Sequence, residues 1–315
     1  MTSGMTAFVV RRVIWTIPVI LLVIFFTFVL MRQIEGNPFR TSERAIPESI
    51  QRNLERKYGL DRPWFVQYLL YVKGVATLDL GPSLVLRNRS VNDIVRDHFP
   101  KSLELGFLAM VFALAFGVPL GMVAALRANT KVDYSAMFVS NVGFAIPSFL
   151  ISTLLIYFFA LKWGDIFGFP TSGWNSWQSK VLPVIALGIG PMAYFARLTR
   201  GSMLETLQQD YIRTSKAKGL RWRRVVFVHT LRNSLIPVVT AAGPILGYLI
   251  TGSFIIEQIF AIPGIGRYYV TAVTARDYSV VMGLTVLLAL IVIIANLVVD
   301  ILYAFLDPRI RDARA

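Results

Sequence analysis

Long apolar stretches that are almost free of charge constrain this chain more than any other feature. They occupy six blocks of the sequence, at 13–31, 105–126, 137–161, 181–196, 235–256 and 280–306. A helix of about 20 apolar residues, rising ~1.5 Å per residue, crosses the roughly 30 Å hydrocarbon core of a bilayer. The blocks therefore predict an all-α membrane protein with six transmembrane helices. The first of these helices, 13–31, precedes a large extracytoplasmic loop, 32–104, and the other five lie in a transmembrane core, 105–306.

The placement of basic residues predicts how the helices are oriented. Cytoplasmic loops of membrane proteins are enriched in Lys and Arg. The chain has 32 Lys and Arg against 18 Asp and Glu. The segments 1–12, 127–136, 197–234 and 307–315 together hold 16 basic residues, and the short loops 162–180 and 257–279 hold two each. The loop 32–104 holds 12, but long translocated segments largely escape this rule. We therefore expect the N-terminus 1–12, the loop 197–234 and the C-terminus 307–315 to be cytoplasmic, with the positive charge reflecting a membrane rather than nucleic acid.

The residues of catalysis and metal binding are scarce. There is no cysteine, and the two histidines, His98 and His229, are far apart in the sequence. The sequence has no G-x-x-x-x-G-K-[ST] phosphate-binding loop, no G-x-S-x-G motif and no H-E-x-x-H motif. We therefore expect a chain that is not an enzyme and that binds no metal or cofactor itself. Either other subunits supply energy, or the chain is a passive channel or secondary carrier.

Proline and glycine interrupt four of the apolar blocks. Freed backbone groups inside a membrane are tolerated only against protein or a water-filled space, so helix breaks at these residues would line a translocation path. The candidates are Pro147, Gly188, Pro191, Gly243, Pro244 and Gly247, with Pro119 and Gly121 in the second block. The alternative is ordinary close packing of helices through small residues.

Two loops are longer than a connection requires. In 197–234 the pattern predicts a helix over 203–218, with Gly219 just past its end in a left-handed conformation, and a second helix over 221–232. This basic hairpin is either a docking element or an anchor for anionic lipid. In 32–104, helices are predicted at 46–58 and 64–75, and the loop is either a solvated cap or a platform for an external partner.

Several segments resemble the B-type permease subunit of oligopeptide and dipeptide ABC importers. The stretch DYIRTSKAKGL at 210–220 is similar to that family's coupling loop, and HTLRNSLIPVV at 229–239 matches its His-x-x-x-Asn-x-x-x-Pro pattern. Further matches span most of the chain: RRVIWTIPVI at 11–20, YGLDRPWFVQYLLYVKGVATLDLGPS at 58–83, FPKSLELG at 99–106, GSFIIEQIFAIPGIG at 252–266, ARDYSVVMG at 275–283 and VDILYAFLDPRIR at 299–311.

The resemblance implies a fold, a function and partners. It implies a type I ABC importer permease in a bacterial cytoplasmic (inner) membrane that forms half of a peptide pathway. Nickel, glutathione or another small solute is the alternative substrate within the family. The implied partners are a homologous second permease, two ATPase subunits that use ATP and Mg²⁺, an extracytoplasmic binding protein or lipoprotein, and membrane lipid. The implied ATPase-coupling residues are Asp210, Tyr211, Arg213, Thr214, Ser215, Lys216, Ala217, Lys218, Gly219 and Leu220.

Overall fold

The computed structural model describes residues 2–33, 56, 59–86, 88–251 and 254–306, and most of this part of the chain is helical. Within it, β-structure is confined to an isolated bridge between Pro82 and Ser90. The helix expected at 64–75 is confirmed as α3 (Trp64–Ala76). The helix expected at 46–58 falls, apart from Arg56, outside the described residues.

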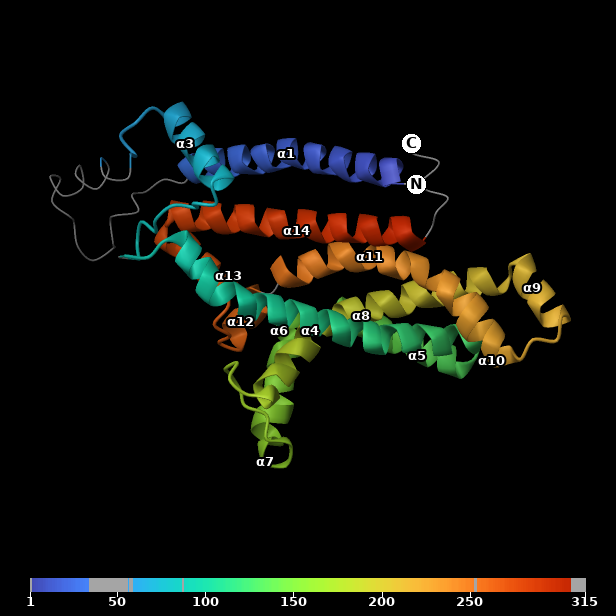
Figure 1. Ribbon diagram of the computed structural model, residues 1–315. Helices are drawn as coiled ribbons and strands as arrows, with labels where there is room; N and C mark the ends of the chain where they lie inside the picture. Colours follow the sequence, from blue (N-terminus) through green and yellow to red (C-terminus); the bar gives the residue numbers. More distant parts are fainter. Residues whose placement is uncertain (1, 34–55, 57–58, 87, 252–253, 307–315) are drawn as a thin grey trace. The chain divides into compact units, whose positions relative to one another are not determined.

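Helices long and apolar enough to cross a membrane account for most of the described chain (Figure 1). Five stretches qualify: α1 (Thr2–Gln33), α4 (Val91–Leu126), α8 (Trp177–Leu207), α14 (Tyr278–Leu306), and the series of α10 (Trp222–Arg224), η2 (Val225–Leu231), α11 (Arg232–Thr251) and α12 (Phe254–Ile259). A sixth span arises if a bent pair of helices is counted as one. This confirms the all-α membrane fold.

The bent pair, here called the third span, comprises residues 131–162. It consists of α5 (Lys131–Ala145), α6 (Ser148–Leu155) and the π-helix η1 (Ile156–Lys162). The two halves meet at an angle of 101°. Ile146 is extended there, with φ −80° and ψ 125°, which is the conformation that a following proline favours. The break predicted at Pro147 is therefore confirmed, and α7 (Gly164–Phe167) follows the span.

The chain divides into two compact units, of which the first comprises residues 1–102 and 263–293. Its core joins the start of α4 to α13 (Ile265–Ala275) and α14 through Val91, Ile94, Ile265, Ala272, Val280, Val281 and Leu284. Hydrogen bonds join the same segments: the Ser102 hydroxyl accepts from the Ile265 amide at 2.9 Å. The segments predicted to be outer loops, 32–104 and 257–279, thus contribute to one unit.

Asp277 organises the loop that precedes α4. Its side chain is 2% exposed and accepts hydrogen bonds from the Ser83 hydroxyl and from the amides of Leu84 and Val85, the last two at 3.1 and 3.2 Å. It also accepts from the Val280 amide in the first turn of α14, at 3.3 Å. A buried carboxylate needs such donors to replace its lost hydration. Asp277 therefore joins two segments that are almost 200 residues apart.

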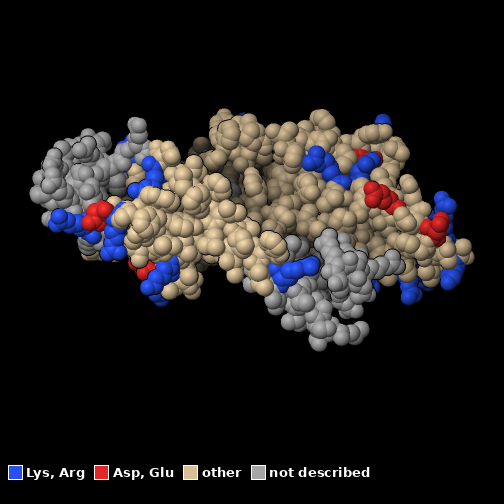
Figure 2. Space-filling view, turned by 90° about the horizontal axis from the view of Figure 1, so that it is seen from above, with Lys and Arg blue, Asp and Glu red and all other residues tan. Residues whose placement is uncertain are grey.

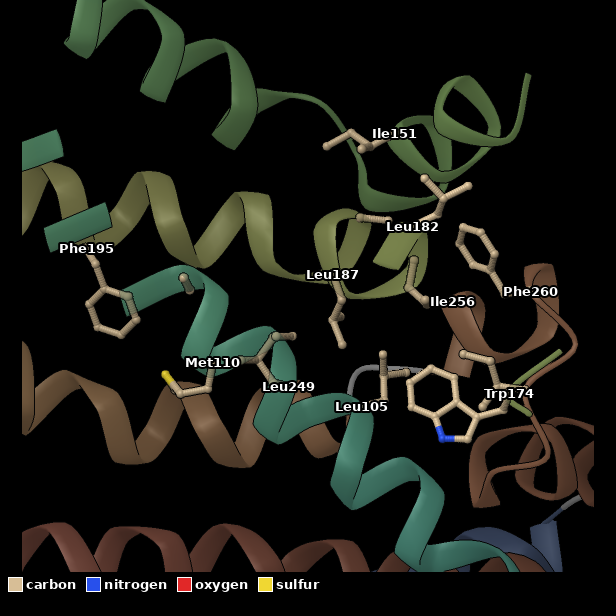
Figure 3. Close-up of a cluster of buried hydrophobic side chains, with 14 of the residues drawn as sticks. Leu105, Met110, Ile151, Trp174, Leu182, Leu187, Phe195, Leu249, Ile256 and Phe260 are labelled. Atoms are coloured by element: carbon tan, nitrogen blue, oxygen red, sulfur yellow. The ribbon is translucent and has the colours of Figure 1, made fainter. Parts of the chain in front are cut away.

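The second unit comprises residues 103–262 and 294–315 and has a large apolar core. α4 contributes Leu105 and Met110 to it, and α8 contributes Leu182, Leu187 and Phe195. Leu249, Ile256, Phe260, Ile151 and Trp174 complete the cluster that Figure 3 shows. The core therefore holds α4, α8 and α11 together around the N-terminal half of α8.

Glycines allow α4 and α8 to pack at backbone distance. A Cβ on Gly117 would lie 2.5 Å from the Met192 carbonyl oxygen, and one on Gly121 would lie 2.2 Å from the Ala196 carbonyl oxygen. Likewise, a Cβ on Gly188 would lie 2.6 Å from the Phe112 ring. Close packing through small residues, the alternative considered from the sequence, is what these glycines provide.

The helix breaks expected in the second, fourth and fifth blocks are wrong where the chain is described. α4 continues through Pro119, α8 through Pro183 and Pro191, and α11 through Pro237 and Pro244. A proline removes one backbone donor and widens a helix locally, but neighbouring helices can hold the turn in place. Gly188, Gly243 and Gly247 are buried within these continuous helices.

Candidate functional site

The strongest candidate site is the hairpin formed by residues 208–231, here called the α9 hairpin. α8 ends at Leu207, Gln209 is extended with ψ 146°, and α9 (Asp210–Ala217) begins after it. The continuous helix expected over 203–218 is therefore wrong, because the chain turns at Gln208 and Gln209. Gln208 and Gln209 are both polar and exposed, so little buried packing is lost when the chain turns there. The second helix of the hairpin starts at Trp222 and continues through η2.

Gly219 ends α9 as predicted. Its φ is +73°, in the left-handed region that favours glycine. The Gly219 amide donates to the Lys216 carbonyl at 3.0 Å, and the Leu220 amide donates to the Ser215 carbonyl at 3.4 Å. This pair of bonds is the Schellman pattern, which satisfies the last carbonyls of a helix. A Cβ at Gly219 would meet no atom within 4 Å, so the demand for glycine here comes from the backbone conformation.

One apolar side chain anchors α9. Ile212 is fully buried, whereas the other α9 residues are exposed or half-buried. Beside it, the Tyr211 hydroxyl accepts a hydrogen bond from the Asn233 amide group at 2.9 Å. The same Asn233 nitrogen donates to the His229 carbonyl at 3.1 Å. The His-x-x-x-Asn pattern of the sequence thus places Asn233 where it holds α9 against η2 and α11.

A small polar and apolar cluster closes the base of the hairpin. The Ser234 hydroxyl donates to the Thr230 carbonyl at 2.8 Å and lies 3.1 Å from the Thr206 hydroxyl oxygen. The buried side chains of Ala125, Met203 and Val226 pack together beside it. These contacts connect the end of α8 to the start of the next span, so α9 extends from a supported base.

The exposed surface of the hairpin is basic. Arg213, Lys216, Lys218, Arg221, Arg223 and Arg224 are all exposed. Figure 2 shows Lys and Arg side chains gathered at the right-hand end, which carries α9 and α10, while neighbouring helices present mostly uncharged surface. The Lys216 ammonium lies 4.9 Å from the centroid of the Trp222 ring. The ion pair between Arg213 and Asp210, at 3.7 Å, is solvent-exposed and contributes little to stability.

Of the predicted coupling residues, the structure therefore brings Asp210–Leu220 together on one capped helix and the turn after it. Sequence reasoning passed over Ile212, which is the residue that fixes this helix to the rest of the unit. A signal was present, because Ile212 is the single aliphatic β-branched residue between Gln208 and Gly219. Nothing in the sequence indicates that Tyr211 and Asn233 meet.

A cavity of about 570 Å³ lies in the same unit, beside the bend of the third span. Pro147 and Ser148 from the bend, Pro191 and Tyr194 from α8, and Tyr248 from α11 contribute to its lining. The described lining residues carry no charge and are mostly apolar. Of the residues proposed from the sequence, Pro147 and Pro191 line the cavity, and Gly188, Gly243, Pro244 and Gly247 are not among its lining residues.

The described residues hold no group of three or more His, Cys, Asp or Glu side chains that could bind a metal ion. The hairpin presents an exposed basic surface, and the cavity has an uncharged lining.

Comparisons with known proteins give the chain a family. Residues 117–312 match the model of the binding-protein-dependent transport system inner membrane component, and residues 5–106 match the model of the N-terminal region of such membrane components. A solved structure described as an inward-facing conformation of the MetNI methionine ABC transporter has a similar fold, with a TM-score of 0.57. It is 20% identical, and the match covers 68% of this chain and 96% of that one.

Curated relatives extend over nearly the full length. The dipeptide transport system permease protein DppB of Bacillus subtilis is 47% identical, with 98% of each chain covered. The oligopeptide transport system permease proteins OppB of Haemophilus influenzae and Escherichia coli are 42% and 43% identical, covering 98% of this chain and all of theirs. The chain therefore belongs to the family of binding-protein-dependent transport system inner membrane components.

Proposed function

We propose that this chain forms half of the translocation pathway of an ATP-driven importer for di- and oligopeptides, and that the α9 hairpin couples it to separate ATPase subunits. Membership of the family makes the chain a multi-pass permease component of the inner membrane. The proposal adds the substrate class, the energy source and the contact through which energy arrives.

The geometry of the α9 hairpin is the observation that carries the coupling role. A short helix that transmits force has to be rigid, properly ended and exposed on one side. α9 meets these requirements, because Ile212 and Tyr211 fix it, Gly219 ends it, and its basic residues face outward. A lipid anchor would need the positive charge but not the capped end.

The cavity supports a peptide as the substrate. Peptides differ in charge from one to the next, so a pathway for many peptides is expected to carry hydroxyl and aromatic groups rather than a fixed charge. Tyr194, Tyr248 and Ser148 supply such groups. A path for a divalent metal ion would instead favour carboxylates, which the described lining lacks. The names of the curated relatives point to the same substrate class.

The partners follow from what this chain does not supply. A homologous second permease would complete the pathway, and two ATPase subunits, using ATP and Mg²⁺, would bind beneath the α9 hairpin. A binding protein or lipoprotein would deliver substrate to the outer side. The unit that combines residues of 32–104 and 263–293 is the proposed platform for it. Movement of the ATPases would then switch the pathway between two states by rigid-body motion.

Uptake of defined substrates by the complete complex tests the proposal. The chain is purified together with its second permease and ATPase subunits, reconstituted in vesicles, and supplied with the cognate binding protein. Labelled di- and tripeptides should accumulate only with ATP. If nickel or glutathione accumulates with ATP and peptides do not, the proposed substrate class is wrong. If the flux is equal without ATP, the chain is a passive channel or a secondary carrier.

Thiol labelling tests the proposed orientation. The chain has no native cysteine, so introduced cysteines report without background. Ser172→Cys lies in an exposed part of the 162–180 loop, and Lys218→Cys lies in the exposed turn of the hairpin. An impermeant maleimide should label the first variant and not the second in intact cells. Labelling of Lys218→Cys before membrane permeabilisation would contradict cytoplasmic placement of the hairpin.

A further inference from the structure

A buried ion pair connects the helix that bears the hairpin to the third span. Arg200 lies on α8, and Asp133 lies in the first turn of α5. The Arg200 Nε is 2.6 Å from Asp133 Oδ1, and its Nη2 is 2.7 Å from Oδ2. The Asn129 amide donates to Oδ2 at 2.9 Å. The Asp133 side chain is 1% exposed and the Arg200 side chain 27% exposed, so the carboxylate is buried while the guanidinium is partly open to solvent.

The two hydrogen bonds fix the relative orientation of the Arg200 and Asp133 side chains as well as their separation. Two parallel hydrogen bonds between a guanidinium and a carboxylate hold the two planes in one orientation, which a lysine in place of arginine cannot do. The carboxylate also sits at the N-terminal end of α5, where a negative charge is favoured. α5 therefore cannot slide or turn at this end without either moving Arg200 or breaking the pair.

Each of the two helices leads from the pair to a part of the proposed mechanism. α8 continues for seven residues from Arg200 to Leu207, after which the chain enters the α9 hairpin. α5 continues from Asp133 to Ala145 and then to the bend at Pro147, which lines the cavity. The pair is thus a link between the hairpin end of α8 and the element that bends beside the cavity.

We propose that Asp133 and Arg200 are positioning residues that transmit displacement of the α9 hairpin to the third span. The inference rests on the proposed coupling function and adds the connection by which coupling reaches the cavity. When the hairpin moves the end of α8, the pair carries the start of α5 with it, and the angle at Pro147 changes.

The other end of α8 supplies a matched control. There the Lys180 ammonium lies 2.5 Å from Glu104 Oε1, and the Trp174 indole donates to Oε2 at 2.9 Å. This second pair ties α8 to α4, which packs against α8 through Gly117 and Gly121 as α5 packs against α8 around the first pair. It is similar in chemistry to the first pair but does not touch the third span.

The test measures peptide transported per ATP hydrolysed in vesicles that contain the complete complex. Asp133→Asn with Arg200→Gln removes both charges and leaves no lone buried ion, whereas each single variant leaves one. A link predicts that the double variant hydrolyses ATP but transports about tenfold less peptide per ATP, within the usual range of coupling between sites. Glu104→Gln with Lys180→Gln should keep the wild-type ratio. A wild-type ratio in the Asp133–Arg200 double variant would overturn the proposal.

Crosslinking distinguishes a mechanical connection between α5 and α8 from a requirement of the ion pair for folding, because the same protein sample is measured before and after the reaction. In Asp133→Cys with Arg200→Cys, the uncrosslinked complex should be uncoupled, and a short bifunctional thiol reagent should restore the ratio at least severalfold. No change on crosslinking would contradict the link, even if the double-charge variant fails to assemble. Gly219→Val provides the separate test of the coupling function: if it uncouples while these variants do not, the link alone is wrong.

Discussion

α8 and the third span both carry proline in an apolar segment, yet one is straight enough to remain a single helix and the other bends by 101°. α8 is heavily buried and lies against α4 at backbone distance. The third span leaves large side chains exposed, among them Phe138, Val139 and Phe149. Proline therefore does not decide by itself where a membrane helix breaks. α5 and α6 both pack against α8, so the break in the third span follows from the extended backbone before Pro147 and not from a lack of packing.

This difference suggests that α8 and the third span have different roles in transport. α8 behaves as a rod that carries the α9 hairpin, and the third span is the part whose shape can change beside the cavity. Three changes test these different roles: disturbing the packing of α8 against α4, removing the side chain that anchors α9, and replacing the proline at the bend of the third span.

Loosening the rod should have the largest effect. In Gly121→Ala the new methyl group would lie 2.2 Å from the Ala196 carbonyl oxygen, and backbone cannot move aside as a flexible side chain can. Overpacking of this kind costs about 1–3 kcal/mol or more, so folded protein and assembled complex should decrease strongly. Gly190→Ala is the control, because its Cβ would meet nothing within 4 Å. The melting temperature in detergent is measured for both variants. If they are equally stable, close packing against α4 is not what keeps α8 rigid.

Detaching the hairpin should have the next largest effect. Ile212→Ala removes the one fully buried side chain of α9, a change that typically costs about 2–5 kcal/mol locally. We expect the membrane helices to assemble while peptide-stimulated ATP hydrolysis falls by roughly tenfold or more, as ~1.4 kcal/mol corresponds to each factor of ten. Glu205→Ala, at an exposed position near the end of α8 and outside the expected coupling residues, is the control. Normal stimulation in Ile212→Ala would show that α9 does not need its anchor.

Straightening the bend should have a smaller effect on stability and a selective one on transport. Pro147→Ala restores a backbone donor and allows α5 and α6 to approach one helix. Transport should fall severalfold while assembly is kept. Pro183→Ala in α8, where the helix is already continuous, should transport at nearly the wild-type rate. Distances between spin labels on α5 and α6 would show whether the bend is lost, and an unchanged distance would mean that packing, not Pro147, sets the angle.

Local features of this structure could be predicted from the sequence, and contact-dependent features could not. α3 and the left-handed Gly219 follow from apolar periodicity and from glycine just past a helix end. The hairpin and its basic surface follow from charge placement. The continuity of α8 through two prolines depends on α4, and the turn at Gln208–Gln209 depends on where Ile212 finds a buried site. The pairing of Asp133 with Arg200 joins residues 67 positions apart, which no local pattern encodes.

The most direct test of the central claim, that the α9 hairpin couples ATP hydrolysis to transport, is the effect of Gly219→Val. A β-branched residue at φ +73° is strained by about 1–2 kcal/mol or more, although the position has open space around it. Gly201→Val is the matched control, since that glycine also has open space but is helical. Gly219→Asn should recover much of the function, because asparagine tolerates this conformation.

Peptide uptake and phosphate release are measured in parallel on vesicles that contain all subunits. The account predicts that Gly219→Val assembles but loses most uptake, with ATP hydrolysis either low or independent of the binding protein, while Gly201→Val behaves as the wild type. If Gly219→Val takes up peptide at the wild-type rate, the hairpin does not couple the two processes. If neutralising Arg221, Arg223 and Arg224 together then abolishes uptake, the hairpin is a lipid anchor instead.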